Sequence, residues 1–335
     1  MAIAQAGAVR RVCITGGAGF IGSNLADRLC ADGVDVVIVD DLSRGRREFL
    51  ADALSHPGTT LIRGDVRDPA TLERAIDGCD WVFHLQANAD VRNGFDDPRR
   101  DLEQNTLATA GVLEAMRTCG VRRIVFSSSG SVYGEPETFP TTEDAPFPVQ
   151  TSLYGASKLA GEGLISAYAN GYGFTGVICR FVSIMGERYT HGHLFDFYCA
   201  LKRDPGRLRI LGDGCQRKSY LYVEDCVQAM LTAARHHDDE PGVHIYNLGT
   251  DETVTVDESV AIVAQHLSLA PEIEHTGGSR GWIGDSPLIH LDTTRIQRLG
   301  WRPQLTIEQA AARTLEWFDT STYAWRSEAP EGVES

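Results

Sequence analysis

Residues 11–22 read Arg11-Val-Cys-Ile-Thr-Gly16-Gly-Ala-Gly19-Phe-Ile-Gly22. The first five form a short, β-branched run that is typical of a buried strand, and helical spacing of apolar residues begins at Ser23. Three glycines at this spacing allow a tight turn, a close approach of the backbone to a pyrophosphate, and close packing of a helix on a strand. The free N–H groups at the start of the helix would point at the phosphates. The stretch therefore predicts a dinucleotide-binding turn.

An acidic residue closes the next predicted strand. Asp40 ends residues 34–40; a carboxylate there would accept hydrogen bonds from the adenosine ribose hydroxyls and repel a 2′-phosphate, so we expect NAD as the cofactor. Arg44 and Arg46 lie nearby and leave NADP as an open alternative. Asp65, which follows the third predicted strand, is either a contact to the adenine amino group or an ordinary solvated loop acid.

The first half of the chain alternates short β-branched runs with helical stretches, which is typical of βαβ units around a parallel sheet. Strands are expected at residues 9–15, 34–40, 60–63, 81–85, 124–128 and 177–181. Helices are expected at residues 23–31, 69–76, 102–118 and 154–170, with shorter ones near 195–203 and 256–267. We predict an α/β fold: a Rossmann-type doubly wound parallel sheet with a smaller, interleaved α/β substrate-binding region.

The pattern loosens after Phe181, and this sets the expected domain division. Residues 1–181 are predicted to form the NAD-binding Rossmann domain, with returning segments near 222–250. Residues 182–325 would form mainly the substrate-binding region, interleaved because no repeat or low-complexity linker separates the parts. The tail, 326–335, is expected to be disordered.

Composition excludes several functional classes. The 335 residues carry a formal net charge of −15, a field that repels phosphate and therefore argues against binding to nucleic acid or to an anionic membrane. No apolar run approaches the length of a membrane span, and residues 1–8 lack the layout of a signal peptide, so we expect a cytoplasmic protein.

Cysteine and histidine spacing argues against a metal site. The eight cysteines are scattered without a CxxC pair, which favours reduced, mostly buried thiols over disulfides or zinc ligands. His191 and His193 have a spacing that suits a metal, but no third ligand is evident, so we predict none.

Serines end the fifth predicted strand, and a Tyr-x-x-x-Lys pattern begins the next long helix. Tyr154 and Lys158 are one helical turn apart, so both side chains can face the same cleft. A tyrosine with its ordinary pKa of about 10 is a poor base, but a lysine ammonium and an oxidised nicotinamide both favour the phenolate. Tyr154 is therefore a candidate general base, with Ser129 orienting the same substrate hydroxyl and either Ser127 or Ser128 in support.

These residues together resemble the extended short-chain dehydrogenase/reductase family, within it the NAD-dependent epimerase/dehydratase family, and most closely the branch that contains UDP-glucose 4-epimerases. The resemblance runs from Ile14 to Pro303, which is nearly the whole chain. Its supporting segments are His84-Leu-Gln-Ala-Asn88, Asp101-Leu-Glu-Gln-Asn-Thr106, Ser152-Leu-Tyr-Gly-Ala-Ser-Lys158 and Leu211-Gly-Asp-Gly-Cys-Gln-Arg-Lys-Ser-Tyr-Leu-Tyr-Val223.

The resemblance implies roles for individual residues, beginning with Ser129, Tyr154 and Lys158 as the catalytic group. The residues implied to contact NAD are Gly16, Gly19, Phe20, Ile21, Gly22, Asp40, Asp65, Val66, Leu85, Gln86, Ala87, Asn105, Ser127, Tyr154 and Lys158. Those implied to contact a nucleotide-diphosphate sugar are Arg92, Ser129, Ser183, His193, Arg217, Lys218, Tyr220, Arg280 and Asp285. Among them, Lys218 or Arg217, with Arg280, would neutralise the diphosphate. The helices at 102–118 and 154–170 would pair across a homodimer.

The sequence departs from the family pattern at three places. Gly130-Ser131 follows Ser129 where sugar 4,6-dehydratases of the family carry an acid pair and decarboxylases a Glu, so elimination would lack its proton donor. Ser183 stands where many relatives have an Asn that binds the substrate. Gln86 stands where a small residue is usual, and a polar contact to the ribose or the sugar is the only account of it.

We therefore expect a nucleotide-sugar 4-epimerase that oxidises C4 of the sugar with bound NAD and reduces it again on the opposite face. The alternatives are a 4-ketoreductase or dehydrogenase, an epimerase of another nucleotide-sugar such as a uronic acid or heptose, and a non-enzymatic NAD-sensing scaffold. Arg92 lies where uronic-acid epimerases place an arginine for the substrate carboxylate, but neutral-sugar relatives keep an arginine there too.

Overall fold

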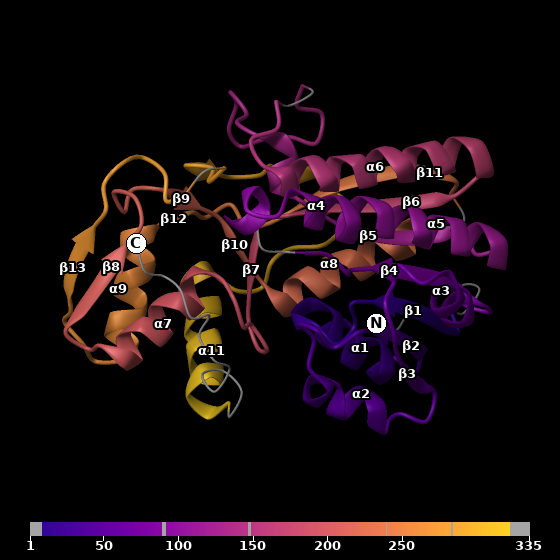
Figure 1. The fold of residues 1–335 in the computed structure, drawn as a ribbon, viewed down its shortest axis with the longest axis horizontal. Coiled ribbons are helices and arrows are strands. Elements are labelled where there is room, and N and C mark those ends of the chain that lie inside the picture. The colour runs from indigo at the N-terminus through magenta and orange to yellow at the C-terminus, as the bar shows by residue number, and fades with distance from the viewer. Residues whose placement is uncertain (1–8, 89–91, 147–148, 239, 283, 322–335) are drawn as a thin grey trace.

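The computed structural model describes residues 9–88, 92–146, 149–238, 240–282 and 284–321 (Figure 1). Within these ranges the main sheet has seven parallel strands in the order β11-β6-β5-β4-β1-β2-β3. They are β1 (Arg11–Thr15), β2 (Asp35–Asp40), β3 (Thr59–Arg63), β4 (Trp81–His84), β5 (Arg123–Ser129), β6 (Thr175–Phe181) and β11 (Gly242–Leu248). The strand order reverses between β1 and β4, as in doubly wound folds, where ligands bind at the carboxyl ends of the strands near the switch point. The predicted fold class is confirmed.

Helices cover both faces of the sheet (Figure 1). One face carries α3 (Pro69–Ile76), α5 (Ala108–Cys119) and α6 (Leu153–Tyr172), and the other carries α1 (Phe20–Ala31), α2 (Ala51–Ser55) and α8 (Val223–His236). Val12 and Ile14 of β1 pack in the core beneath α1 and α8, whereas Cys13 packs beneath α3, α5 and α6. Since neighbouring side chains of a strand point to opposite faces, the two clusters form the two core layers of the fold.

A smaller part of the molecule, at the left of Figure 1, contains most of the chain after β6. Its strands form three short sheets, β10-β7, β12-β9-β14 and β13-β8. The strands are β7 (Ser183–Met185), β8 (Arg207–Ile210), β9 (Arg217–Lys218), β10 (Tyr220–Tyr222), β12 (Val254–Thr255), β13 (Glu272–His275) and β14 (Leu288–Ile289). The helices are α7 (His193–Arg203), α9 (Val256–His266), α10 (Thr294–Gln297) and α11 (Ile307–Thr320).

The two parts are interleaved along the chain, because α8 and β11 return to the main sheet after β10. Strand β11 pairs with β6 along its whole length, from Gly242 opposite Thr175 to Leu248 opposite Phe181. The division at residue 181 stays a prediction, and the predicted disordered tail, 326–335, lies outside the described residues. In the described part of the chain, no helix combines the length and the apolar character needed to cross a bilayer.

Local hydrogen bonds explain where the predicted element boundaries were wrong. The long helix expected at 102–118 begins with a π-helical turn, Leu102–Leu107, before α5. Asn105 lies inside this turn, and its carbonyl accepts a hydrogen bond from the Thr109 hydroxyl at 2.6 Å. Helix α6 starts one residue earlier than expected because Ser152 caps it, and it runs to Tyr172, before the left-handed Gly173. Side chains that bond the backbone therefore set these boundaries.

A buried ion pair joins α6 to β6. The guanidinium of Arg180 donates to both carboxylate oxygens of Glu162, at 2.9 and 2.6 Å, and also to the Tyr133 hydroxyl at 2.7 Å. The Ser128 hydroxyl donates to the same carboxylate. Every charge in this network has a partner, which is the condition for keeping ions in a core.

Replacing Glu162 should therefore destabilise the fold. In Glu162→Ala the Arg180 guanidinium loses its carboxylate, and we expect the free energy of unfolding to fall by about 3–5 kcal/mol, measured by urea denaturation. Glu114→Ala is the matched control, because Glu114 pairs with Arg117 within a helix at an exposed position and should change stability far less. Equal losses in the two variants would contradict this account of the network.

Candidate functional site

The glycine turn between β1 and α1 is packed too closely for side chains. Gly16 has φ +70°, and a Cβ there would lie 2.7 Å from the Gln86 Cα; a Cβ on Gly22 would lie 2.7 Å from the backbone of the turn itself. Helix α1 begins at Phe20, and Gly19 provides no side-chain cap. The first N–H groups of α1 are therefore left for an external acceptor, and the turn has the donors and the backbone approach that a pyrophosphate needs.

Asp40 ends β2 with its carboxylate against this turn. One carboxylate oxygen accepts the Ala18 N–H and the other accepts the Leu42 N–H, both at 2.9 Å. Burial raises the pKa of Asp40, and the two N–H groups oppose that rise by stabilising the charged form. The carboxylate is thus held in place, with further lone pairs available to ribose hydroxyls.

Asp65 lies at the end of β3 in a partly exposed ion pair. Its carboxylate accepts hydrogen bonds from the Arg67 guanidinium, the shortest being 2.6 Å, and these bonds lower the pKa of Asp65. Val66, the next residue, is buried. An adenine contact would have to share Asp65 with Arg67, so the predicted role stays a prediction.

The loop after β4 runs along the other side of the glycine turn. The Leu85 N–H donates to the Thr15 carbonyl at 3.1 Å, and Gln86 lies against Gly16. The Gln86 side-chain oxygen is buried, and within the described ranges it has no hydrogen-bond donor. A buried acceptor without a donor costs about 1–3 kcal/mol, so a ligand hydroxyl or amide bound here would recover that cost.

Next to this loop lies a network of hydrogen-bonded polar side chains. The sequence predicted a role for only one of them, Asn105. Its side-chain oxygen accepts the Asn88 N–H at 2.8 Å, and its amide donates to the Ser157 hydroxyl at 2.8 Å. His84 bonds Thr15 at 2.7 Å and Thr109 at 3.0 Å, and burial lowers the pKa of His84 to about 3. The Thr109 hydroxyl donates its hydrogen to the Asn105 carbonyl, so it must accept a hydrogen bond from His84 Nε2–H. His84 is therefore the neutral tautomer that carries its proton on Nε2.

Sequence reasoning quoted His84 and Asn88 within a motif but assigned them no role. Their signal is that His84 ends the otherwise apolar strand β4 and Asn88 follows it closely, and buried polar groups need partners. These partners lie on β1, on α5 and in residues 101–105, so the sequence alone does not identify them.

Lys158 is buried on α6 below the end of β5. Its ammonium donates to the Ser127 carbonyl at 2.8 Å and lies 4.9 Å from the Phe126 ring centroid and 5.9 Å from the Tyr154 ring centroid. Burial lowers the pKa of Lys158 to about 7, while the carboxylates of Asp101 and Glu162 oppose this. Lys158 can therefore hold positive charge beside Tyr154 near neutrality.

Tyr154 shares a hydrogen bond with Ser129, while burial raises the pKa of Tyr154 to about 12. The Ser129 hydroxyl in turn accepts the Ser131 N–H at 3.1 Å. The structure thus brings together the three predicted catalytic residues, at the carboxyl end of β5. A phenolate near neutral pH needs added positive charge, and Lys158 and an oxidised nicotinamide are the two sources that the chemistry offers.

Two of the predicted diphosphate contacts meet in the smaller part of the molecule. Lys218 forms a buried ion pair with Asp285 at 2.5 Å, and its ammonium lies 5.0 Å from the Trp282 ring centroid. Arg280 donates to the Asp285 carbonyl at 2.7 Å and pairs with Glu135 at 2.6 Å. Trp282 was not predicted; an aromatic ring beside a cation suits a nucleotide base or a sugar face.

The side chain of Arg217 points to the opposite side of β9 from that of Lys218. It precedes Lys218 on β9, where neighbouring side chains alternate, and its guanidinium donates to the Thr253 carbonyl at 3.2 Å. Of the two candidates for the diphosphate, Lys218 is therefore the one that the structure places beside Arg280.

Three other predicted substrate contacts lie together. Ser183 on β7 is the register partner of Tyr220 on β10, and the Tyr220 hydroxyl bonds the His193 ring at 2.6 Å. Burial and Lys218 lower the pKa of His193 to about 3, so the ring is neutral and contributes hydrogen bonds without charge. The side chain of Arg92 lies outside what the structure describes.

The NAD dependent epimerase/dehydratase family matches residues 12–249. This chain belongs to that family. The UDP-glucose 4-epimerase of Mycolicibacterium smegmatis is 35% identical, over 92% of this chain and 98% of the relative. Two solved structures, each with a TM-score of 0.82, are also similar. The UDP-glucose 4-epimerase of Thermus thermophilus in complex with NAD is 33% identical and covers 93% of this chain and 99% of its own. The UDP-glucose 4-epimerase of Thermotoga maritima with UDP-glucose is 30% identical and covers 92% and 98%.

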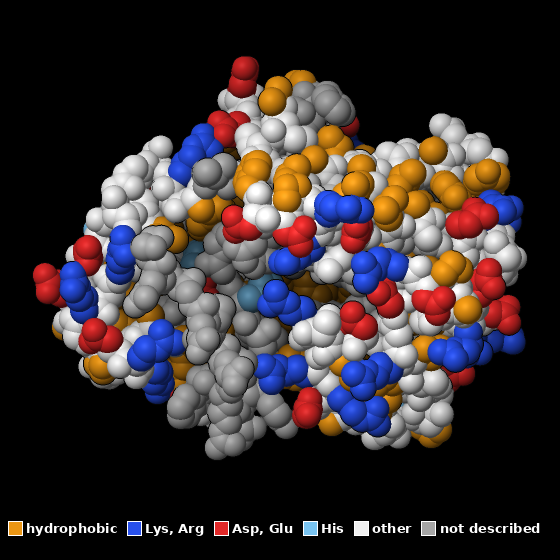
Figure 2. All heavy atoms as spheres, viewed as in Figure 1, with side chains coloured by type: hydrophobic (Ala, Val, Ile, Leu, Met, Phe, Trp, Pro, Cys, Tyr) orange, Lys and Arg blue, Asp and Glu red, His pale blue; other side chains and the backbone are white. Residues whose placement is uncertain are grey.

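These similarities confirm the family and the NAD cofactor that the sequence predicted. The geometry of this epimerase/dehydratase chain fits that cofactor: a glycine turn with free N–H groups, the fixed Asp40 carboxylate, and the unsatisfied Gln86 oxygen lie on neighbouring loops. The individual contacts remain predictions. Figure 2 shows a hollow near the middle of the molecule in this view, with Lys or Arg side chains at its rim.

The glycine turn gives a direct test of the NAD site. Gly16→Ala adds a Cβ 2.7 Å from the Gln86 Cα, so the two loops must separate, and we expect NAD affinity measured by calorimetry to fall at least about tenfold. Gly33→Ala is the matched control, because Gly33 also has positive φ, at +78°, but no atom lies within 4 Å of its Cβ position. Backbone strain alone should lower the stability of both variants but should not lower the NAD affinity of either. If Gly16→Ala bound NAD as tightly as the wild type, the glycine turn would not be part of the NAD site.

Proposed function

We propose that this chain is a nucleotide-sugar 4-epimerase that interconverts UDP-glucose and UDP-galactose. The observation that carries the proposal is the cluster of Ser129, Tyr154 and Lys158 at the end of β5, followed by Gly130 and Ser131 in place of an acid. Relatives of similar length that carry the same activity in their names support the substrate assignment.

Each of the three residues has a separate role in the proposed reaction at C4 of the sugar. NAD supplies a hydride acceptor that returns the hydride later. Tyr154 takes the proton of the C4 hydroxyl, and its hydrogen bond to Ser129 positions that hydroxyl. The Lys158 ammonium stabilises the phenolate. Tyr154 then holds the proton while the 4-keto sugar turns, and gives it back when the opposite face is reduced.

Rotation of the 4-keto sugar requires that the nucleotide is anchored while the sugar is held loosely. We propose that Lys218, Arg280 and Trp282 form the anchor, since both cations contact Asp285 and the Lys218 ammonium lies against the Trp282 ring. Both cations already have acid partners, so the diphosphate must add to or replace these pairs. The neutral His193 and the hydroxyl of Ser183 offer hydrogen bonds that a rotating hexose can exchange.

Proton NMR of purified protein with UDP-glucose tests the proposal. We expect C4 inversion to UDP-galactose without net NADH, and a fall in kcat of about 10²–10⁴ in Tyr154→Phe, which removes the general base. Tyr168→Phe is the control, because Tyr168 lies on the same helix and bonds Glu114 at a surface position. Stoichiometric NADH would indicate a dehydrogenase, and a product altered only at another carbon would refute 4-epimerisation.

We also propose that the chain forms a homodimer through the outer faces of the π-helical turn Leu102–Leu107, α5 and α6. Leu102 and Leu107 on the π-helical turn and Tyr172 on α6 are large apolar side chains that are 50%, 55% and 54% exposed. Figure 2 shows hydrophobic side chains gathered over α6. Covering such a surface is the usual reason for a subunit contact. A cytoplasmic location is part of the proposal, because each of the eight cysteines, all within the described ranges, is free.

A charge in this surface should separate the subunits. We expect Leu107→Glu to convert a dimer to a monomer in size-exclusion chromatography with light scattering, since the carboxylate would be buried without a partner. Val149→Glu is the control, because Val149 is an exposed apolar residue, at 86%, outside these helices. Wild-type protein that elutes as a monomer, or equal behaviour of the two variants, would exclude this interface.

A further inference from the structure

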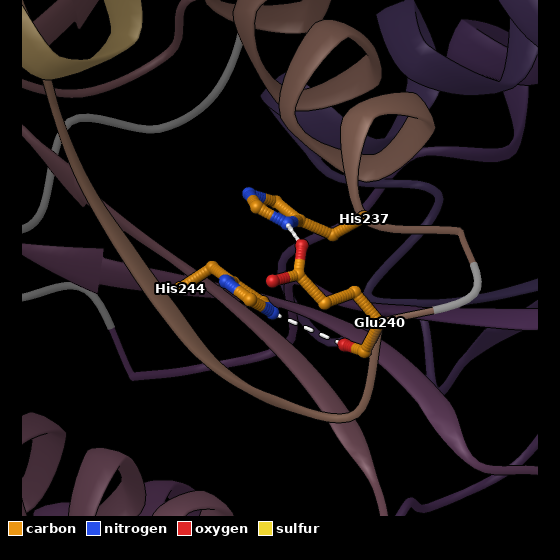
Figure 3. A group of neighbouring side chains, drawn as sticks. All are labelled: His237, Glu240 and His244. Atoms are coloured by element: carbon orange, nitrogen blue, oxygen red, sulfur yellow. Dashed lines mark hydrogen bonds and ion pairs between the residues drawn. The ribbon is translucent and has the colours of Figure 1, made fainter.

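Three potential metal ligands lie together where α8 passes into β11 (Figure 3). His237 directly follows α8, Glu240 lies in the connection, and His244 is on β11. One ligand atom from each residue lies within 4.8 Å of the others. The family resemblance assigns no role to this segment.

Hydrogen bonds already orient the group. His237 Nδ1 lies 2.7 Å from a carboxylate oxygen of Glu240, and His244 Nε2 lies 3.1 Å from the Glu240 carbonyl oxygen. The two imidazole rings are stacked, with centroids 3.5 Å apart and planes inclined by 11°. On its far side, His237 Nε2 bonds the Tyr246 hydroxyl at 2.6 Å. This last contact is of the kind that fixes the ring of a metal-binding histidine.

Hydrogen bonds also hold the backbone at Glu240 and Gly242. The Gly242 N–H donates to the Phe174 carbonyl at 2.9 Å, and the Thr175 hydroxyl donates to the Glu240 carbonyl at 3.2 Å. These two residues are therefore attached to the start of β6, beside the three side chains. An ion bound here would need to order little of the backbone at Glu240 and Gly242.

A metal ion would take the place of the proton between His237 and Glu240, because metal ligands must be deprotonated. A neutral ring that now donates from Nδ1 to Glu240 can instead donate from Nε2 to Tyr246, because a hydroxyl both donates and accepts.

We propose that His237, Glu240 and His244 form a binding site for a divalent transition-metal ion such as Zn²⁺, with water completing the coordination. Two imidazole nitrogens and one carboxylate oxygen favour Zn²⁺, Co²⁺, Ni²⁺ or Cu²⁺ over Mg²⁺ and Ca²⁺. Bonds of about 2.1 Å in a tetrahedron need ligand atoms about 3.4 Å apart. The outermost atoms must therefore approach by up to about 1.4 Å, and the His244 ring must turn out of its stack with His237 so that both rings can point a nitrogen at the ion. Rotations of Glu240 and His244 about their side-chain bonds can provide both changes.

The position of the site indicates a structural role. Gly242 and His244 begin β11, whereas Tyr154 and its partners lie at the opposite, carboxyl end of the sheet. An ion here would fasten the end of α8 to the outermost strand of the sheet. It would raise stability without entering the reaction.

Titration of the full chain with ZnCl₂, after removal of any purification tag, tests the site. We expect calorimetry and metal analysis to give one ion per chain, the Tm to rise, and Co²⁺ to develop the strong visible absorption of tetrahedral coordination. His244→Ala and Glu240→Ala should each weaken Zn²⁺ binding at least about tenfold and abolish the Tm rise, because each removes one of three ligands.

His236→Ala is the matched control, since His236 is the neighbouring, exposed histidine outside the group and should bind Zn²⁺ as the wild type does. Circular dichroism without metal shows whether each variant is folded, and Glu240→Gln provides a second, nearly isosteric loss of the carboxylate. Absence of Zn²⁺ binding by the wild type, or wild-type affinity in His244→Ala and both Glu240 variants, would overturn the proposal. Equal loss in His236→Ala would do the same.

Discussion

The hydrogen bond from the Lys158 ammonium to the Ser127 carbonyl connects α6 to the central sheet. Because Lys158 is buried and its charge needs an acceptor, this contact fixes α6 against the end of β5. Tyr154 is one turn earlier on that helix, and Ser129 is two residues later on that strand. The same contact therefore sets the distance between the proposed general base and the residue proposed to orient its substrate.

An ion pair near Lys158 also holds α6 against the sheet. Glu162, one turn after Lys158, is held by Arg180 of β6 and by Ser128 of β5, so α6 is fixed at two successive turns. The site then combines a buried tyrosine whose pKa is high with a buried lysine whose pKa is low. Neither group is suited to catalysis alone, and an oxidised nicotinamide would supply the charge that makes the phenolate accessible. This dependence suits an enzyme in which base strength should rise only when NAD⁺ is bound.

The sequence could predict the features that depend on local spacing. The glycine turn follows from the spacing of its glycines, the six strands from short β-branched runs, and the Tyr154–Lys158 pair from the helical period. Features that depend on distant partners were missed: His84 is explained only by Thr109 on α5, and Trp282 only by Lys218 on β9. Strand β9 has two residues, so its pattern could not decide between Arg217 and Lys218. The assignment of Asp65 was complicated by Arg67, a neighbour whose charge competes with any ligand.

Strand β11 has a consequence for how the chain acquires its structure. It pairs with β6 only after the segment between Val182 and His236 has been made, so the outer edge of β6 stays open during synthesis of that segment. An open parallel edge offers unpaired N–H and C=O groups to other chains. Contacts between strands so far apart in sequence also form slowly, because a long loop must close first. A chain stopped near residue 181 would thus expose the open edge of β6 to other chains, and the synthesis of β11 is the step that covers this edge.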